Sequence, residues 1–230
     1  MKRLILFDVD GTLVSGGPAK EAFQEALLEV FGTAGPIREW EFSGKTDPQI
    51  ARELLQAAGL DEGRINRGLP ELFDRYLGKL EARLPENPTR LLAGVGPLLA
   101  GLAEMAARRE LGLGLVTGNL SRGADLKLVA AGIRTDFPVG AYGSDHEFRN
   151  ELPGIALRRA REHWGLPVRP EQAVVVGDTP RDVECGRHHG TRTVAVATGR
   201  FTALELEETG ADVVLEDLSD GERVLAALLG

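Results

Sequence analysis

The stretch LILFDVDGT, residues 4–12, joins four consecutive apolar residues to two acids. An apolar run without polar alternation is typical of a strand buried on both faces, as in a parallel sheet between two helix layers. Aspartate is a poor strand residue, so Asp8 ends the strand. Residues two apart in an extended segment point the same way, and we expect Asp8 and Asp10 to face one crevice. Alternatively, the two acids only begin a turn, whose sharp exit Gly11 permits.

Further apolar runs recur in the second half of the chain and predict more strands. They stand at residues 113–116, 173–176 and 193–196, with weaker ones at 212–215 and 137–139. Helical patterns separate them, at residues 96–109, 122–131, 154–164 and 181–190. This alternation predicts an α/β fold with a doubly wound, mostly parallel sheet.

Residues 15–86 break the alternation. They carry no strand pattern, but helical spacing recurs at residues 19–31, 47–58 and 65–83. A single crossover between parallel strands needs only one helix. We therefore expect residues 15–86 to form an inserted helical cap domain. Residues 1–14 and 87–230 then form a discontinuous core, which the chain re-enters through the linker PENP at residues 85–88.

The amino-acid composition argues against some classes of binding partner. The 230 residues are 43% hydrophobic and 27% charged, as in an ordinary globular protein. The net charge of −8 and the 5% aromatic content argue against binding of nucleic acid or of a membrane surface. The lone Cys185 fits a reducing compartment, and no apolar stretch approaches the ~20 residues of a membrane span. We expect a cytoplasmic monomer or homodimer that acts on a small molecule.

A second pair of acids follows another predicted strand. In doubly wound sheets, ligands bind beyond the carboxyl ends of the strands. The strand at residues 173–176 is followed by Asp178 and, one helical turn later, by Asp182. The same segment also fits the N-cap of a helix that begins at Pro180. The two interpretations are compatible, because capping and metal ligation use different lone pairs.

The strand at residues 113–116 ends in Thr117, Gly118 and Asn119. A hydroxyl and free amide groups at the start of a helix can bind an anion, although this tripeptide is also common in loops. Several carboxylates at one sheet edge repel one another, and a hard divalent cation such as Mg²⁺ removes that cost. Acids with Mg²⁺ on one side and amides on the other form a site that accepts a phosphate.

Three segments, in order, resemble three of the four motifs of the haloacid dehalogenase-like hydrolase superfamily. They are DVDGT at residues 8–12, VTGN at residues 116–119 and GDTPRD at residues 177–182. The cap segment SGKTDPQI, residues 43–50, is similar to the phosphoglycolate phosphatase-like branch. The resemblance implies a Rossmann-like core with an inserted cap and a Mg²⁺-dependent phosphoric monoester hydrolase whose substrate is a small phosphorylated metabolite.

The resemblance also implies roles for the four acids. Asp8 would be the nucleophile that forms an aspartyl-phosphate, and it would also ligate Mg²⁺. Asp10 would protonate the leaving alcohol, then activate water, and its main-chain carbonyl would be a metal ligand. Asp178 would complete the protein ligands, and Asp182 would act on the metal indirectly, either by contacting its direct ligands or through water.

The remaining candidates would contact the substrate. By the same resemblance, Thr117 with the amides of Gly118 and Asn119 would hold the phosphoryl oxygens. In the cap, Lys45 could reach the substrate when the cap closes, and its neighbour Thr46 is a further possible contact.

One motif departs from the family pattern. The family places a lysine upstream of the last acid pair, but no lysine follows Lys127 in this chain. Arg149 stands about where that lysine should be, and we expect it to neutralise the nucleophile and phosphate. Arginine keeps the charge but changes the geometry. The alternative is a surface ion pair of Arg149 with Asp145 or Glu147.

The leading hypothesis is a phosphatase that hydrolyses a small phosphate monoester similar to phosphoglycolate. Three alternatives remain open. One is a sugar phosphomutase of the same superfamily, and another is a haloacid dehalogenase, which would need neither a metal nor Asp10. The third is a phosphate-binding regulatory module without catalysis, which the missing lysine would favour.

Overall fold

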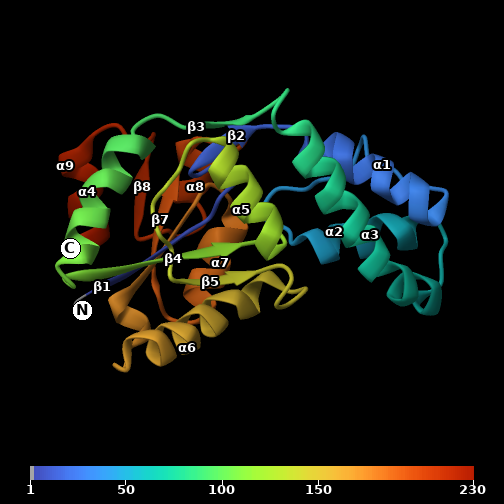
Figure 1. Cartoon of the computed structure of the whole chain (residues 1–230). Helices are drawn as coiled ribbons and strands as arrows, with labels where there is room; N and C mark the ends of the chain where they lie inside the picture. The colour runs from blue at the N-terminus through green and yellow to red at the C-terminus, as the bar shows by residue number, and fades with distance from the viewer. Residues whose placement is uncertain (1–2) are drawn as a thin grey trace.

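The computed structural model describes residues 3–230, and these residues form an α/β core with a helical insertion (Figure 1). The core sheet is six-stranded and parallel, in the order β5-β4-β1-β6-β7-β8. The strands are β1 (Arg3–Phe7), β4 (Leu111–Thr117), β5 (Val139–Tyr142), β6 (Ala173–Gly177), β7 (Arg192–Val196) and β8 (Val213–Leu215). The expected α/β class with a doubly wound parallel sheet is confirmed.

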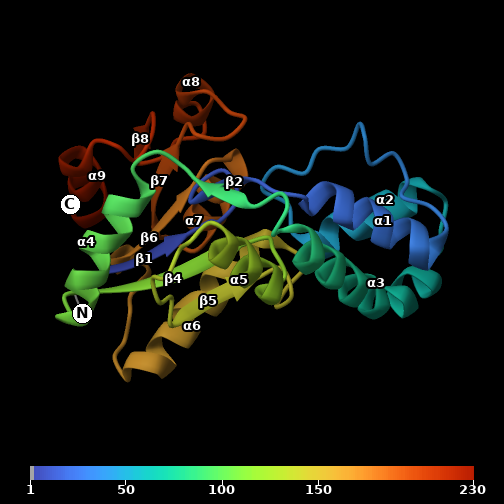
Figure 2. The same ribbon diagram turned by 45° about the horizontal axis from the view of Figure 1, so that its top comes forward.

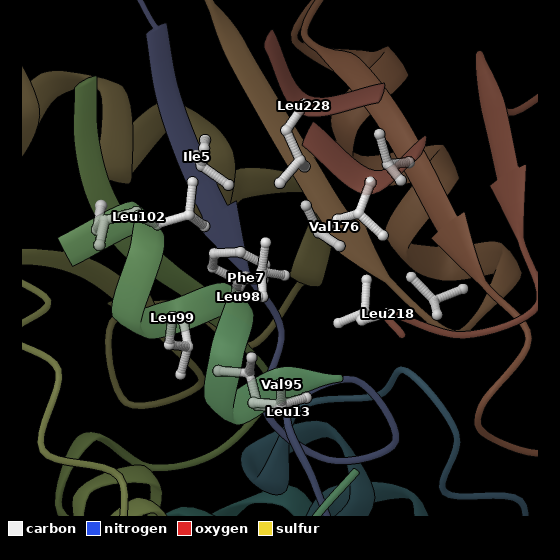
Figure 3. Packing of buried hydrophobic residues seen from close by; sticks show 14 of the residues in the cluster. Ile5, Phe7, Leu13, Val95, Leu98, Leu99, Leu102, Val176, Leu218 and Leu228 are labelled. Carbon is white, nitrogen blue, oxygen red and sulfur yellow. The ribbon is translucent and has the colours of Figure 1, made fainter. Parts of the chain in front are cut away.

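Helices cover both faces of the sheet. One face carries α4 (Val95–Ala107), α5 (Ser121–Ala130) and α9 (Gly221–Leu229), and the other carries α6 (Leu152–Trp164) and α7 (Pro180–His188). The pleat of β1 separates its side chains accordingly. Ile5 and Phe7 pack with residues of α4 (Figure 3), whereas Leu4 and Leu6 belong to the apolar cluster of the opposite face. This two-sided burial explains the uninterrupted apolar run.

The insertion lies at one end of the molecule, away from α4 and α9 (Figure 2). It consists of α1 (Ala19–Phe31), α2 (Asp47–Ala57) and α3 (Glu62–Arg83), which enclose an apolar cluster that Leu120, just before α5, also joins. Within it, the rings of Phe23 and Tyr76 meet edge to face with their centroids 4.9 Å apart. Among the described residues, no helix combines the length and the apolar character needed to cross a bilayer.

Two short antiparallel strands, β2 (Val14–Gly16) and β3 (Thr89–Leu91), connect the insertion to the core. We propose the domain boundary there, with residues 15–86 as the cap; residues 1 and 2 of the proposed core segment lie outside the described residues. The sequence pattern does not predict these strands, because each has three residues of which two are exposed. Of the weak apolar run at residues 137–139, only Val139 lies in a strand. β5 begins there because Pro138 has no amide hydrogen to donate to a neighbouring strand.

Truncation of a buried side chain in β1 tests this packing. Leu6 is fully buried, so Leu6→Ala should lower the free energy of unfolding by about 2–5 kcal/mol through lost burial and a residual cavity. The matched control is Leu204→Ala in the short helix α8 (Ala203–Glu207), where the side chain is 66% exposed. The control should change stability by no more than about 0.5 kcal/mol in urea unfolding. Similar losses in both variants would contradict the packing described.

Candidate active site

The candidate site lies where three neighbouring strands end. The register pairs Phe7 of β1 with Val176 of β6 on one side and with Leu115 of β4 on the other. The amide of Asp8, just beyond β1, donates to the carbonyl of Val176 over 2.8 Å. Because parallel strands present their carboxyl ends at one edge, the segments that follow them meet there.

Three acids form a cluster at this edge. Carboxylate oxygens of Asp8, Asp178 and Asp182 all lie within 4.8 Å of one another, and each side chain is buried. Gly11 makes room for the cluster: its φ is +82°, and a β-carbon there would overlap the carboxylate of Asp178. The carboxylate of Asp10 is not part of the cluster.

The cluster is electrostatically suited to a divalent cation. Burial raises the pKa of Asp8 to about 6, although Arg149 opposes this and Asp182 adds to it. Burial also raises the pKa of Asp178 to about 8, reinforced by repulsion from Asp182 and Asp8. In both cases burial is the main cause, because it disfavours the charged carboxylate, and repulsion between the acids adds to the shift. Oxygen ligands in a buried, electron-rich cluster are the donors that a hard divalent cation takes.

Arg149 lies inside the site and not on the surface. It belongs to a single 3₁₀ turn, η1 (Arg149–Glu151), and is 5% exposed. Its Nη2 is 3.0 Å from Asp8 Oδ1 and also forms an ion pair with Asp182. The surface alternative is wrong, because Asp145 pairs with Arg159 and Glu147 pairs with Arg52. Arg149 is therefore placed to compensate the charge of Asp8.

Asp182 is held in place by local partners. Its Oδ2 accepts from the amide of Thr179 over 2.9 Å and from the Thr179 hydroxyl over 2.6 Å, while Oδ1 pairs with Arg149. Thr179 and Asp182 form a capping box at the start of α7, so the N-cap interpretation of this segment is correct. Asp178 is less constrained: the Thr12 hydroxyl lies 3.3 Å from its Oδ1.

A second polar cluster lies beside the acids. Asp10 Oδ2 accepts from Nδ2 of Asn119 over 2.8 Å and from Nζ of Lys127 over 2.6 Å. Lys127 Nζ also donates to Asn119 Oδ1 over 2.6 Å. Burial opposes the charge of Lys127, but attraction by Asp10 and Asp47 outweighs it and raises the pKa of Lys127 above its usual value. The ammonium therefore stays charged.

The loop after β4 lies against the same edge. Thr117 is buried at the end of β4, and its hydroxyl accepts from Nδ2 of Asn119 over 2.8 Å. Gly118 is in contact with the cap, since a β-carbon there would overlap the carbonyl of Lys45. Thr117, Gly118 and Asn119 all line the same cavity as Asp8 and Asp10.

That cavity has a volume of about 480 Å³ and lies between core and cap. Its core side includes Asp8, Asp10, Asp178, Arg149, Lys127 and the loop after β4. Its cap side combines an apolar wall with polar side chains: the apolar residues are Ala19, Phe23, Trp40, Phe42, Ile50 and Tyr76, and the polar ones are Lys20, Glu41, Ser43, Lys45 and Asp47. Such a combination of an apolar wall with a few convergent polar groups is typical of a small-molecule site.

The cap is docked on the core by polar contacts. The amide of Asp47 donates to the carbonyl of Gly118 over 2.8 Å, and Asp47 Oδ2 accepts from the amide of Leu120 over 2.9 Å. Arg52 Nε donates to Glu147 Oε1 over 2.8 Å. Burial raises the pKa of Asp47 to about 6, against opposing contributions from Lys127 and the Leu120 amide.

The two cap candidates have different positions. Lys45 lines the cavity, but its Nζ is held by Glu53 and lies 5.5 Å from the centroid of the Trp40 ring. Thr46 does not line the cavity. Its hydroxyl caps α2 by accepting from the amide of Gln49, and it donates to the carbonyl of Glu147 over 2.6 Å.

Sequence reasoning did not identify Lys127, Asp47 and Tyr76 as site residues. A signal for Lys127 exists, because it is a lone charged residue on the buried face of α5, beside Ala124 and Leu128. Tyr76 has no comparable signal in the sequence, because it belongs to the apolar cluster of the cap like its neighbours on α3. Its hydroxyl makes no hydrogen bond with the described residues, although its ring lines the cavity.

The chain is similar in sequence and in structure to known proteins. A family model described as haloacid dehalogenase-like hydrolase matches residues 2–190. A phosphoglycolate phosphatase from Synechococcus elongatus is 32% identical over 94% of this chain and 93% of its own length. The tyrosine-protein kinase PtkA of Mycobacterium tuberculosis is 29% identical over 92% of this chain and 68% of its own. A hydrolase structure from Pseudomonas syringae aligns over 100% of both chains with a TM-score of 0.71 and 21% identity.

The raised pKa values of Asp8 and Asp178 predict how stability depends on pH when metal is removed with EDTA. The native state binds protons that the unfolded state has released above about pH 4, so the free energy of unfolding should fall as pH rises from 5 to 8. Each titrating group contributes a slope of at most about 1.4 kcal/mol per pH unit. In Asp178→Asn the decline between pH 6 and 8 should be shallower in urea unfolding. Equal slopes in both proteins would contradict the prediction.

Proposed function

Because this chain belongs to the haloacid dehalogenase-like hydrolase family, we propose that it is a Mg²⁺-dependent phosphatase acting on a small phosphate monoester such as phosphoglycolate. The observation that carries the proposal is the division of acids at the sheet edge. Asp8 belongs to the acid cluster and contacts Arg149, whereas Asp10 lies outside the cluster but lines the same cavity. This division supports a role for Asp8 in attack on phosphorus and a role for Asp10 in proton transfer.

The metal would be held by Asp8, Asp178 and the main-chain carbonyl of Asp10, with Asp182 acting through water. When bound, Mg²⁺ neutralises charge on the phosphate and on the acids. The buried cluster supports this assignment, because its undercompensated charge favours protons or a cation. Arg149 remains the protein's own positive charge beside the nucleophile.

In the first step, an oxygen of Asp8 attacks phosphorus and the bond from phosphorus to the ester oxygen breaks. Thr117 and the amides of Gly118 and Asn119 hold the phosphoryl oxygens during this transfer. Arg149 offsets charge on Asp8 and on the phosphoryl group. The product of the step is an aspartyl-phosphate on Asp8.

Asp10 moves the protons. It donates a proton to the leaving ester oxygen as that bond breaks, and it then takes a proton from the water that attacks the aspartyl-phosphate. Hydrolysis releases inorganic phosphate and regenerates the carboxylate of Asp8. The side chain of Asp10 is 46% exposed, so it can reach both the leaving oxygen and incoming water.

The cap and the cavity beneath it are consistent with a small substrate. The cavity of about 480 Å³ suits a metabolite, and the docked cap would limit access of bulk water to the phosphoryl group. The similarity to a phosphoglycolate phosphatase supports phosphoglycolate as the first substrate to measure.

Phosphate release tests the proposal directly. The wild-type protein should release phosphate from phosphoglycolate in the presence of MgCl₂, and EDTA should abolish the release. A panel of sugar phosphates measured alongside identifies the preferred ester. Activity that resists EDTA would contradict the assignment. Little free phosphate, with phosphoryl transfer that requires a bisphosphate activator, would favour a phosphomutase.

Asp8→Asn tests the nucleophile. Phosphate release should fall more than about a hundredfold, equivalent to about 2.7 kcal/mol of transition-state stabilisation, because an amide cannot form the phosphoryl bond. The matched control is Asp74→Asn on the exposed face of α3, which should retain wild-type activity. Thermal unfolding checks that both proteins fold. Activity of Asp8→Asn above about a tenth of wild type would reject the assignment.

Arg149→Ala tests the substitute for the family lysine. It should lower kcat/KM by about 10²-fold, because it removes the positive charge beside Asp8. It also leaves Asp182 buried without its cation, at a cost of about 3–5 kcal/mol in stability. Arg149→Lys restores the charge without the forked geometry and should give intermediate activity. Unchanged kcat/KM in folded Arg149→Ala would exclude the role.

A further inference from the structure

Lys127 is a buried cation that the family motifs do not account for. It lies on α5 and is 4% exposed, and its ammonium forms short hydrogen bonds to Asp10 and Asn119. An ammonium is removed from water at high cost unless it is paired. The local structure therefore depends on these contacts. Both partners of Lys127, Asp10 and Asn119, line the cavity.

The contacts fix one oxygen of Asp10 and leave the other free. Oδ2 accepts both the Asn119 amide, over 2.8 Å, and the Lys127 ammonium, over 2.6 Å. Oδ1 makes no hydrogen bond with any residue in the described range 3–230. Without these contacts, the half-exposed carboxylate of Asp10 would rotate freely about its Cβ–Cγ bond. Orienting it for a reaction would then cost conformational entropy.

Lys127 also fixes the amide of Asn119. Its Nζ donates to Oδ1 of Asn119, so Nδ2 of that amide is directed at Asp10 and at the hydroxyl of Thr117. A single buried ammonium thereby links the proposed proton donor to the proposed phosphate-binding loop. Removing it would leave both side chains free to adopt other orientations.

We propose that Lys127 is a positioning residue for Asp10, which holds Oδ2 so that Oδ1 presents its proton to the leaving ester oxygen. The inference rests on the proposed function. In the step concerned, Asp8 forms its bond to phosphorus, the bond from phosphorus to the ester oxygen breaks, and the proton on Asp10 Oδ1 moves to that oxygen. Arg149 has a different task, because its guanidinium contacts Asp8 and Asp182 and not Asp10.

This role predicts a dependence on the leaving group. An alkyl ester such as phosphoglycolate needs a proton on its leaving oxygen, whereas acetyl phosphate, of similar size, releases acetate without one. Lys127→Met should lower kcat for phosphoglycolate by about 10²-fold, the scale of general acid catalysis, and kcat for acetyl phosphate by less than about threefold. KM should change little for either compound. Steady-state phosphate release, corrected for spontaneous hydrolysis, measures both.

Two further variants separate positioning from a structural effect. Lys79→Met changes a lysine of α3 that pairs with Glu29 and does not line the cavity, so it should leave both activities unchanged. In the Asp10→Asn background, Lys127→Met should cost at most about threefold more, because its target is already lost. If Lys127→Met does not fold, Lys127→Gln, which is shorter and uncharged, is compared in the same way.

The outcomes are distinct. A loss confined to phosphoglycolate and absent in the Asp10→Asn background supports positioning. Equal losses on the two compounds, or a full additional loss in the Asp10→Asn background, would overturn the role of Lys127 while leaving the phosphatase proposal intact. If the wild-type protein releases no phosphate from either compound, both proposals fail.

Discussion

The structure depends on the concentration of negative charge at the carboxyl edge of the sheet. Parallel pairing of β1 with β6 brings Asp8 beside Asp178, and the capping box of α7 adds Asp182. Burial disfavours the charged carboxylates and is the main cause of the raised pKa values of Asp8 and Asp178, and repulsion between the acids adds to it. This charge requires compensation. Arg149 supplies part of it, and the three acids are a ligand set consistent with a divalent cation.

Two protein cations divide the acids between them. Arg149 pairs with Asp8 and Asp182, whereas Lys127 pairs with Asp10. In the proposed mechanism, this division separates the carboxylate that attacks phosphorus from the one that carries a proton. Two neighbouring carboxylates with different surroundings are the usual physical basis for different roles in one site. Here the surroundings differ mainly in which cation each acid faces and in exposure, since Asp8 is buried and Asp10 is half exposed.

The cap contacts the loop after β4 directly. Asp47 joins α2 of the cap to the backbone of Gly118 and Leu120, on either side of Asn119. Close approach of Gly118 to the backbone of Lys45 leaves no room for a side chain there. Docking of the cap and ordering of the loop after β4 are therefore parts of one contact surface. A substrate enclosed by the cap would meet a loop that the cap itself holds in place.

Local patterns in the sequence were sufficient to predict the doubly wound core and the helical insertion. They also placed Asp8, Asp10 and Asp178 just after strands, because buried strands and the turns that follow them have short-range signatures. The short strands β2 and β3 lacked such a signature and were not predicted. The motif order predicted that Arg149 faces Asp8, but nothing in the sequence indicated that Lys127 faces Asp10. Arg149 and Lys127 lie 141 and 117 positions from their partners Asp8 and Asp10 along the chain, and only the packing of η1 and α5 against the sheet brings them together.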